Sequence, residues 1–328
     1  MREIQNFFRM TATAIVVLIA NTISGQSIDE ARTLFNEGVT AKNEGNLELM
    51  VQKFQDFIWI TDQLSEDETY EIIGEINSVK AILPQKYLEL STNKLKEKDF
   101  QSGLDYALKS KQTAEKYNDS EILGKSKEIL SKIYYNNGVA KYKTKNYNEA
   151  ILELDKAINE NVNNLKAHDL KLKILKEQEN DALFIAASKE AIAVATNIND
   201  STAKESFLKS SSTYFLKKGN DAKSSLKYDE AITMLNLSLE FNPENPDAYY
   251  LLTLIYNSKS SWDKSIASAD DGLKFEAEGN RARFYYELGN AYFGKGNNTA
   301  ACEAYSKAAV GEYAENAKYQ MEHVVKCE

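Results

Sequence analysis

Histidines, cysteines and carboxylates are the side chains of this chain that could catalyse a reaction or bind a metal. Their spacing indicates no such site. His168 and His323 are the two histidines, and neither stands in a spacing with Ser, Cys or a carboxylate that marks an acid–base or nucleophilic site. Gly-rich phosphate loops and the Gly-x-Ser-x-Gly and His-Glu-x-x-His sequences are absent. Asp and Glu residues are scattered along the chain, which is typical of solvent-exposed helix faces. We therefore expect a non-enzyme that needs no cofactor and no metal.

The two cysteines, Cys302 and Cys327, both lie close to the C-terminal end. If the last two helices pack antiparallel across a turn near Glu312, the cysteines come to roughly the same height. An oxidising compartment would then allow a disulfide between them. The alternative is two separate small apolar residues, and the sequence does not choose between these interpretations.

The N-terminal residues have the order of a secretory signal peptide. Arg2 and Arg9 form a positive region, residues 10–20 are apolar, and residues 21–25 are polar or small. The apolar run is shorter than the roughly 20 residues that cross a bilayer. We expect residues 1–25 to be removed after Gly25, which would place residues 26–328 in the periplasm or outside the cell. An uncleaved anchor or a buried first helix is the alternative.

Composition favours a helical, acidic, soluble chain. Apolar residues make up 43% and charged residues 27%, with only 3 prolines and 14 glycines among 328 residues. The formal net charge is −9, and no long basic stripe occurs. Such a surface suits neither nucleic acid nor an anionic membrane, so no nucleic-acid partner and no direct membrane binding after signal removal are expected.

An internal repeat organises the rest of the chain. Residues 134–158 and 284–309 both run Tyr-Tyr-x-x-Gly, then an Asn-containing turn, then a second amphipathic stretch with Ala at a fixed place. Residues 215–243 contain KYDEAITMLNLSLEFNP, close to NYNEAILELDKAINEN. These residues resemble the tetratricopeptide repeat, a helix-turn-helix of about 34 residues. The resemblance implies an all-α, right-handed α-solenoid of about seven antiparallel helix pairs.

The resemblance places units near 28–61, 84–117, 120–163, 165–198, 201–243, 246–278 and 280–313, with a capping helix at 314–328. Each first helix should carry a small residue where the second helix crosses, and a core residue should follow 16 positions later. The expected small residues are Gly38, Ser91, Gly138, Leu175, Gly219, Thr253 and Gly289. The corresponding core residues are Phe54, Ala107, Leu154, Ala191, Leu235, Ala269 and Tyr305. Units one, two and four depart from the pattern, with Met50, Phe57 and Leu175 at small positions.

Irregular spacing between units predicts extra helix. Ser65 with Glu68 reads as a capping box that opens a helix over 66–83, a spare helix between units one and two. Thr202 with Glu205 reads as another, and together with the run from Ser120 it predicts long first helices in units three and five.

The resemblance also implies that the first helices line an inner groove. Aromatic residues beside amide and cationic groups suit an extended peptide or a partner helix, and sugar stacking is chemically allowed on the same surface. The lysine and asparagine pattern that clamps a terminal carboxylate in some relatives is missing, because Phe35 and Val39 stand there in unit one. Lysines at the rim, among them Lys42 and Lys223, would suit an acidic peptide. The candidate groove residues are Lys132, Tyr135, Val139, Tyr142, Lys143, Tyr250, Leu254, Asn257, Arg283, Tyr286, Asn290 and Phe293.

These observations favour a non-catalytic scaffold that holds a peptide or partner protein, whose identity the sequence does not reveal. One alternative is an accessory component of an envelope assembly or secretion complex. Another is a glycan-binding protein.

Overall fold

The computed structural model describes residues 27–327, and every regular element in that range is helical. The chain divides into two compact units, which meet between Asn164 and Leu165. Within the described range no helix is both long and apolar enough to cross a bilayer. The expected signal peptide lies outside the described residues.

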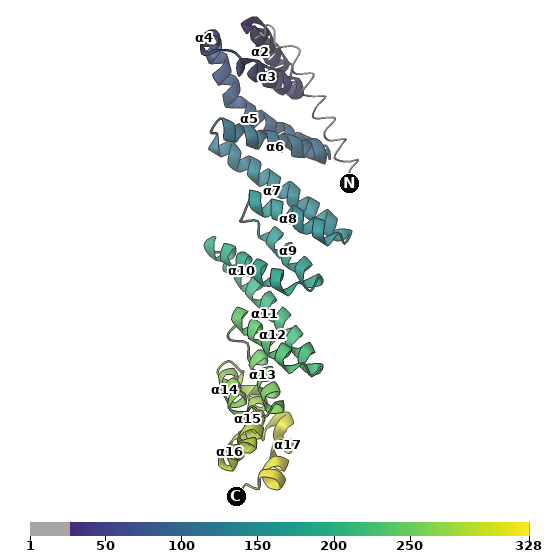
Figure 1. Ribbon diagram of the computed structural model, residues 1–328, viewed down its shortest axis with the longest axis vertical. Coiled ribbons are helices and arrows are strands. Elements are labelled where there is room, and N and C mark those ends of the chain that lie inside the picture. Colours follow the sequence, from purple (N-terminus) through teal and green to yellow (C-terminus); the bar gives the residue numbers. More distant parts are fainter. Residues whose placement is uncertain (1–26, 328) are drawn as a thin grey trace, which may run out of the picture. The chain divides into compact units, whose positions relative to one another are not determined.

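The first compact unit contains three helix pairs joined by tight turns (Figure 1). A four-residue helix and a 3₁₀ turn, α4 (Glu66–Thr69) and η1 (Tyr70–Ile72), connect the first pair to the second. The pairs are α2 (Ile28–Asn43) with α3 (Leu47–Thr61), α5 (Ile73–Lys96) with α6 (Phe100–Lys116), and α7 (Ser120–Lys143) with α8 (Tyr147–Glu160).

The second compact unit contains four pairs and a C-terminal cap. The 3₁₀ turn η2 (Glu278–Asn280) precedes the last pair. The pairs are α9 (Leu165–Glu177) with α10 (Asp181–Asn197), α11 (Ser201–Ser224) with α12 (Tyr228–Phe241), α13 (Pro246–Ser258) with α14 (Trp262–Leu273), and α15 (Ala282–Gly294) with α16 (Asn298–Ala308). The all-α repeat fold predicted from the sequence is thereby confirmed.

Two predictions about helix ends need correction. Ser65 and Glu68 do form the capping box, but it caps only α4, and the expected spare helix over 66–83 is largely the start of α5. The long first helices of units three and five are present as α7 and α11. Asp200, not Thr202, caps α11, because its carboxylate accepts from the Ala203 amide at 2.9 Å. An N-cap carboxylate one residue before the first turn reaches the N3 amide directly.

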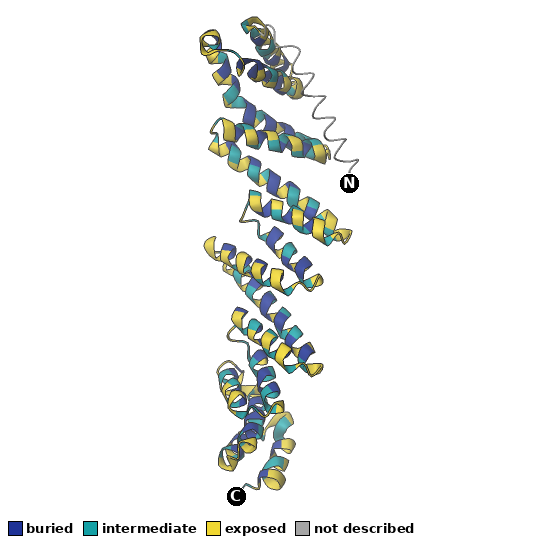
Figure 2. Ribbon diagram, in the orientation of Figure 1, coloured by how far each residue is buried: buried dark blue, intermediate teal, exposed yellow. Residues whose placement is uncertain are grey.

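Small residues let the two helices of a pair approach closely. A Cβ added at Gly38 would lie 2.4 Å from the Phe54 ring, so the large side chain of the second helix fills the space that glycine leaves. The same relation holds for Gly138 with Leu154, Gly219 with Leu235, and Gly289 with Tyr305. Buried residues accordingly follow the facing sides of the helices (Figure 2).

In repeat unit four, the large and the small residue are exchanged between the two helices. Leu175 occupies the position where a small residue was expected, and the position 16 residues later is Ala191. Both are buried, at 1% and 0% exposure. A large residue on the first helix opposite a small one on the second conserves the packed volume, so the departure in sequence is compatible with the same helix pair. In unit one, Met50 and Phe57 are likewise core residues.

The C-terminal cap covers the last pair. It consists of the 3₁₀ turn η3 (Gly311–Tyr313), α17 (Ala314–Tyr319) and a π-helical turn η4 (Gln320–Val325). Ala317 and Val325 join Ala301, Tyr305 and Ala308 of α16 in one apolar cluster. Cys302 and Cys327 form a disulfide, with their Cα atoms 5.7 Å apart, and this bond ties the end of the cap to α16.

Candidate functional site

A cavity of about 350 Å³ opens on the first helices of units five, six and seven. We call it the groove cavity. Apolar side chains meet hydroxyl, amide and charged groups in it. Its lining is Thr213, Leu216, Lys217 and Asn220 of α11, Asp247, Tyr250 and Leu251 of α13, and Arg283 of α15.

Helical spacing places these side chains in the cavity. Gly219 faces α12, where Leu235 closes on it. Leu216 and Asn220 lie three residues before and one residue after that glycine, so they project from a neighbouring face of α11. Tyr250 has the same place on α13 relative to Thr253. The contact that forms each helix pair therefore also sets which residues face the groove.

Arg283 is a groove residue whose positive charge is paired with two carboxylates. One guanidinium nitrogen lies 2.8 Å from Asp247, and Nε donates to the Glu276 carboxylate at 2.7 Å. The guanidinium carbon lies 4.7 Å from the centre of the Tyr250 ring, a cation–π geometry. Arg283 thus joins units six and seven, and it holds Tyr250 in place.

A network of amides and tyrosines continues along α13 and α15. The Asn257 amide donates to the Glu287 carboxylate at 2.8 Å, and the Asn290 amide donates to the same oxygen at 3.1 Å. The Tyr305 hydroxyl donates to the Asn290 oxygen at 2.7 Å. Tyr286 packs between two rings, with centroids 5.7 Å from Tyr305 and 5.6 Å from Tyr313.

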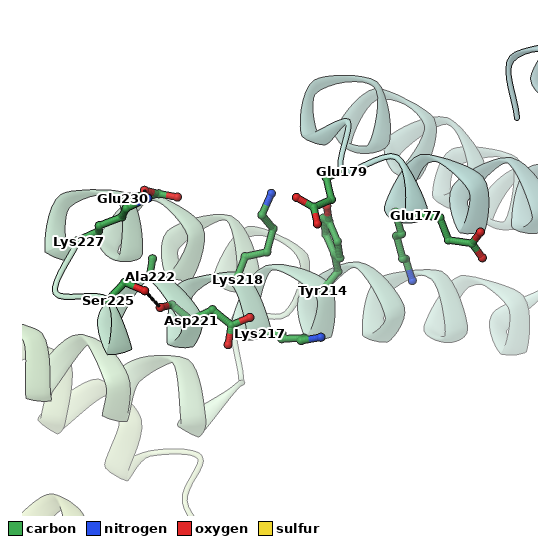
Figure 3. A pocket seen from close by; sticks show the side chains of 11 residues that line it. Glu177, Glu179, Tyr214, Lys217, Lys218, Asp221, Ala222, Ser225, Lys227 and Glu230 are labelled. Carbon is green, nitrogen blue, oxygen red and sulfur yellow. Dashed lines mark hydrogen bonds and ion pairs between the residues drawn. The ribbon is translucent and has the colours of Figure 1, made fainter.

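A second cavity, of about 490 Å³, lies beside the first and shares Lys217 with it (Figure 3). Its lysines and carboxylates alternate. Lys218 pairs with Asp181 at 2.5 Å. Lys176 instead lies 2.5 Å from the Ser210 hydroxyl, and burial lowers the pKa of its ammonium group. Lysines and carboxylates line this cavity in similar numbers, so it does not favour a strongly charged ligand of either sign.

Residues 282–309, the helix pair α15 and α16, match the protein-family model described as tetratricopeptide repeat. This last helix pair is thereby identified as a tetratricopeptide repeat. No curated protein matches it in sequence.

Solved structures of other proteins show a weak likeness in fold to this chain. A crystal structure of MamA is 22% identical over 60% of this chain and 96% of its own, with a TM-score of 0.29. YrrB, described as a tetratricopeptide-repeat protein with an unusual peptide-binding site, is 16% identical over 57% and 90%, with a TM-score of 0.31. A tetratricopeptide-repeat protein from Parabacteroides merdae ATCC 43184 is 12% identical over 90% and 98%, with a TM-score of 0.30. Likeness at this level carries no inference about function.

The groove residues expected on α7 lie in the first compact unit. Lys132 is exposed and pairs with Glu128 on its own helix at 2.7 Å. Tyr142 lies against Tyr147, with ring centroids 6.0 Å apart. Tyr135 and Val139 are half-buried, and Lys143 is exposed. Of the expected residues, the structure brings Tyr250 and Arg283 together in the groove cavity, while Asn257, Tyr286 and Asn290 meet in the neighbouring network.

The α11 side of the groove was not predicted from the sequence. Thr213, Leu216 and Asn220 line the cavity, but they were not among the candidate residues. The signal was present, because they hold the same places relative to Gly219 that the chosen residues hold relative to Thr253 and Gly289. Lys217 directly follows Leu216 and lines both cavities. Its contribution to the two cavities depends on how the neighbouring helices pack.

The two histidines occupy structural environments. His168 is 1% exposed within α9, and the His323 ring stacks on Tyr319 with centroids 4.7 Å apart. Across residues 27–327, no cluster of three or more His, Cys, Asp or Glu side chains has an arrangement that could hold a metal ion.

Proposed function

We propose that this protein is a non-catalytic scaffold that holds an extended peptide or a partner helix in the groove cavity. The cavity itself is the main support for this proposal. Leu216, Leu251 and Tyr250 line it together with the side chains of Thr213 and Asn220. Apolar and aromatic surface supplies binding energy, and a few hydrogen-bonding groups set the orientation of the ligand. The helix pairs preform this surface, so little ordering cost falls on the protein when it binds.

The chemistry of the cavity also suits binding better than catalysis. Asp247 and Arg283 are held in an ion pair at 2.8 Å. Burial raises the pKa of the Tyr250 hydroxyl, so this group is a poor general base near neutral pH. These groups are suited to orienting a ligand.

We further propose that the protein works in the periplasm or outside the cell. The order of charge, apolar run and small residues at its N-terminus favours export. The Cys302–Cys327 disulfide supports the same compartment, because disulfides persist chiefly in oxidising environments.

Proximity labelling in the native host tests both proposals. The tagged chain should enrich one or two envelope or secreted proteins, and the double variant Leu216→Ala/Tyr250→Ala should lose them. If these residues are anchors, affinity for the recovered partner should fall by about 1–4 kcal/mol. Tyr319→Ala is the control, because this residue is 58% exposed and lies on α17 outside the cavity.

Other outcomes would contradict one proposal or the other. An unchanged partner set in a double variant of normal helicity would exclude the groove cavity as the binding surface. Recovery of cytoplasmic proteins alone would contradict export. Retention of the wild-type chain on a polysaccharide column, lost in the double variant, would replace the peptide with a glycan.

A further inference from the structure

Glu287 is a buried carboxylate without a cation. It lies on α15 with 8% of its surface exposed, and no Lys, Arg or His within residues 27–327 pairs with it. Two amide groups, from Asn257 and Asn290, donate to one of its oxygens. The second oxygen has no donor from that range and keeps contact with solvent. A buried carboxylate normally has a partner of opposite charge. The second oxygen of Glu287 can therefore accept a hydrogen bond from one more donor.

Asn257 adds a second acceptor beside this carboxylate. Its side-chain oxygen is buried and has no hydrogen-bond partner, alone among the side chains that the structure describes. Nearly all buried polar atoms are hydrogen-bonded, so such an oxygen calls for an explanation. The nitrogen on the same amide carbon lies 2.8 Å from Glu287, which places the oxygen within about 5 Å of the carboxylate. Two unmet acceptors therefore lie close together.

Tyrosine side chains lie close to Glu287. Burial is the larger cause of the raised pKa of the Tyr250 and Tyr305 hydroxyls, and the nearby charge of Glu287 raises it further. The rings of Tyr286 and Tyr313 lie 5.6 Å apart, and the Tyr250 and Tyr313 hydroxyls lie 3.4 Å apart. Tyr250 already holds the guanidinium of Arg283 over its face. The faces of such rings attract organic cations, especially when a carboxylate lies nearby. We name Asn257, Glu287, Asn290, Tyr250, Tyr286 and Tyr313 the Glu287 cluster.

The charge around the cluster is unbalanced. Arg283 is the nearby cation, and it is held by the carboxylates of Asp247 and Glu276. Glu287 is therefore a third carboxylate on the same stretch of the groove, with no cation left for it. Charge complementarity favours a positively charged ligand here.

We propose that the Glu287 cluster binds a cationic side chain, arginine or lysine, of the protein held in the groove. This inference rests on the proposed scaffold function, and it assigns the chemistry of one anchor. A guanidinium carries donors in a planar fork, so one can bind the free oxygen of Glu287 and a second can reach the buried oxygen of Asn257 when that side chain turns toward it. An ammonium group would satisfy one acceptor at a time, so arginine should bind more tightly than lysine.

Methylguanidinium is a suitable probe because it carries the arginine head group and needs no partner. In nitrogen–proton NMR spectra of the full chain, the side-chain amide signals of Asn257 and Asn290 should shift and saturate as it is added. N-methylurea, a neutral molecule of similar shape, should leave them unchanged. Glu287→Gln should weaken the apparent affinity for methylguanidinium by at least about tenfold, since it removes a charged hydrogen-bond acceptor. The matched control is Glu303→Gln, because Glu303 is exposed on α16.

Each contrary result overturns the inference. The absence of any shift at the two amides, or an equal response to N-methylurea, would show that the cluster does not select a cation. That comparison uses the wild-type chain, so it holds even if Glu287→Gln fails to fold. Equal weakening by Glu303→Gln would mean that overall charge, and not this site, attracts the probe. Because the assay uses no partner, its failure would leave the groove proposal standing.

Discussion

Small and large residues on paired helices depend on one another. Gly219 has no Cβ, and one placed there would lie 2.7 Å from Leu235. Unit four achieves the same pairing with Leu175 and Ala191 exchanged, both of them buried. The repeat is therefore maintained by the combined volume of two positions, and a substitution at one of them should be judged with its partner.

Replacing Gly219 by Ala tests this dependence. The new methyl group would force Leu235 or its helix to move, so we expect a loss of about 1–3 kcal/mol in unfolding free energy. Gly124→Ala is the matched control, because no atom of a neighbouring element lies within 4 Å of a Cβ at Gly124, in the second turn of α7. It should gain about 0.5–1 kcal/mol from the lower backbone entropy of alanine. Chemical denaturation measures both, and equal effects of the two substitutions would contradict the packing account.

At the scale of the elements, caps and turns at the helix ends determine where each helix begins. The Cys302–Cys327 disulfide fixes the C-terminal end of the cap to α16. Each of the two compact units contains whole helix pairs, and within each unit successive pairs pack against one another. The last pair has no following repeat. The cap covers it with Ala317 and Val325, and the disulfide at Cys327 holds the short α17 and η4 in place.

Breaking the disulfide should loosen the cap and leave the distant repeats intact. We expect the double variant Cys302→Ser/Cys327→Ser to lose roughly 2–4 kcal/mol of stability in the last repeat, because the bond closes a loop of moderate length. Hydrogen exchange should rise in residues 310–327 and stay unchanged in residues 28–160. Two free thiols in the denatured, unreduced protein from the native host would instead show that the bond does not form there.

At the scale of the whole molecule, buried or half-buried tyrosines occur in both compact units. Tyr87 belongs to the first, and Tyr214, Tyr250 and Tyr305 to the second. Burial raises the pKa of all four hydroxyl groups above the ordinary tyrosine value. Their ionisation is therefore easier in the unfolded chain than in the folded one.

Alkaline pH should consequently destabilise the whole chain. A group whose folded pKa is raised contributes its full stability below the unfolded pKa, about 10 for tyrosine, and loses it as the pH rises toward the folded value. Urea midpoints should hold steady up to about pH 9 and then fall. Phenolate absorbance should reach its full amplitude only when helicity is lost. Full phenolate absorbance near pH 10 in a chain of unchanged helicity would contradict this expectation.

The sequence by itself determined the repeat, because apolar and small residues recur with helical spacing and few breakers interrupt them. From that recurrence followed the helix pairs, the small residues at Gly38, Gly138, Gly219 and Gly289, and the long α7 and α11. The resemblance to the tetratricopeptide repeat also placed Tyr250 and Arg283 on the groove side. These features depend on contacts within one helix or between two consecutive helices, which is why the pattern of the chain contains them.

Only the tertiary structure decided what those groove residues do. Arg283 was expected only as one of the cationic groups that line the groove, and packing gives it Asp247 and Glu276 as partners. Glu287 drew no notice in the sequence, yet the approach of α13 to α15 buries it beside Asn257 without a cation. The Asn257–Glu287 and Arg283–Asp247 pairings join residues 30 and 36 positions apart, whose distance depends on how successive repeats stack. Spacing along one helix does not contain that distance, so the chemistry of the groove emerged only from the packed structure.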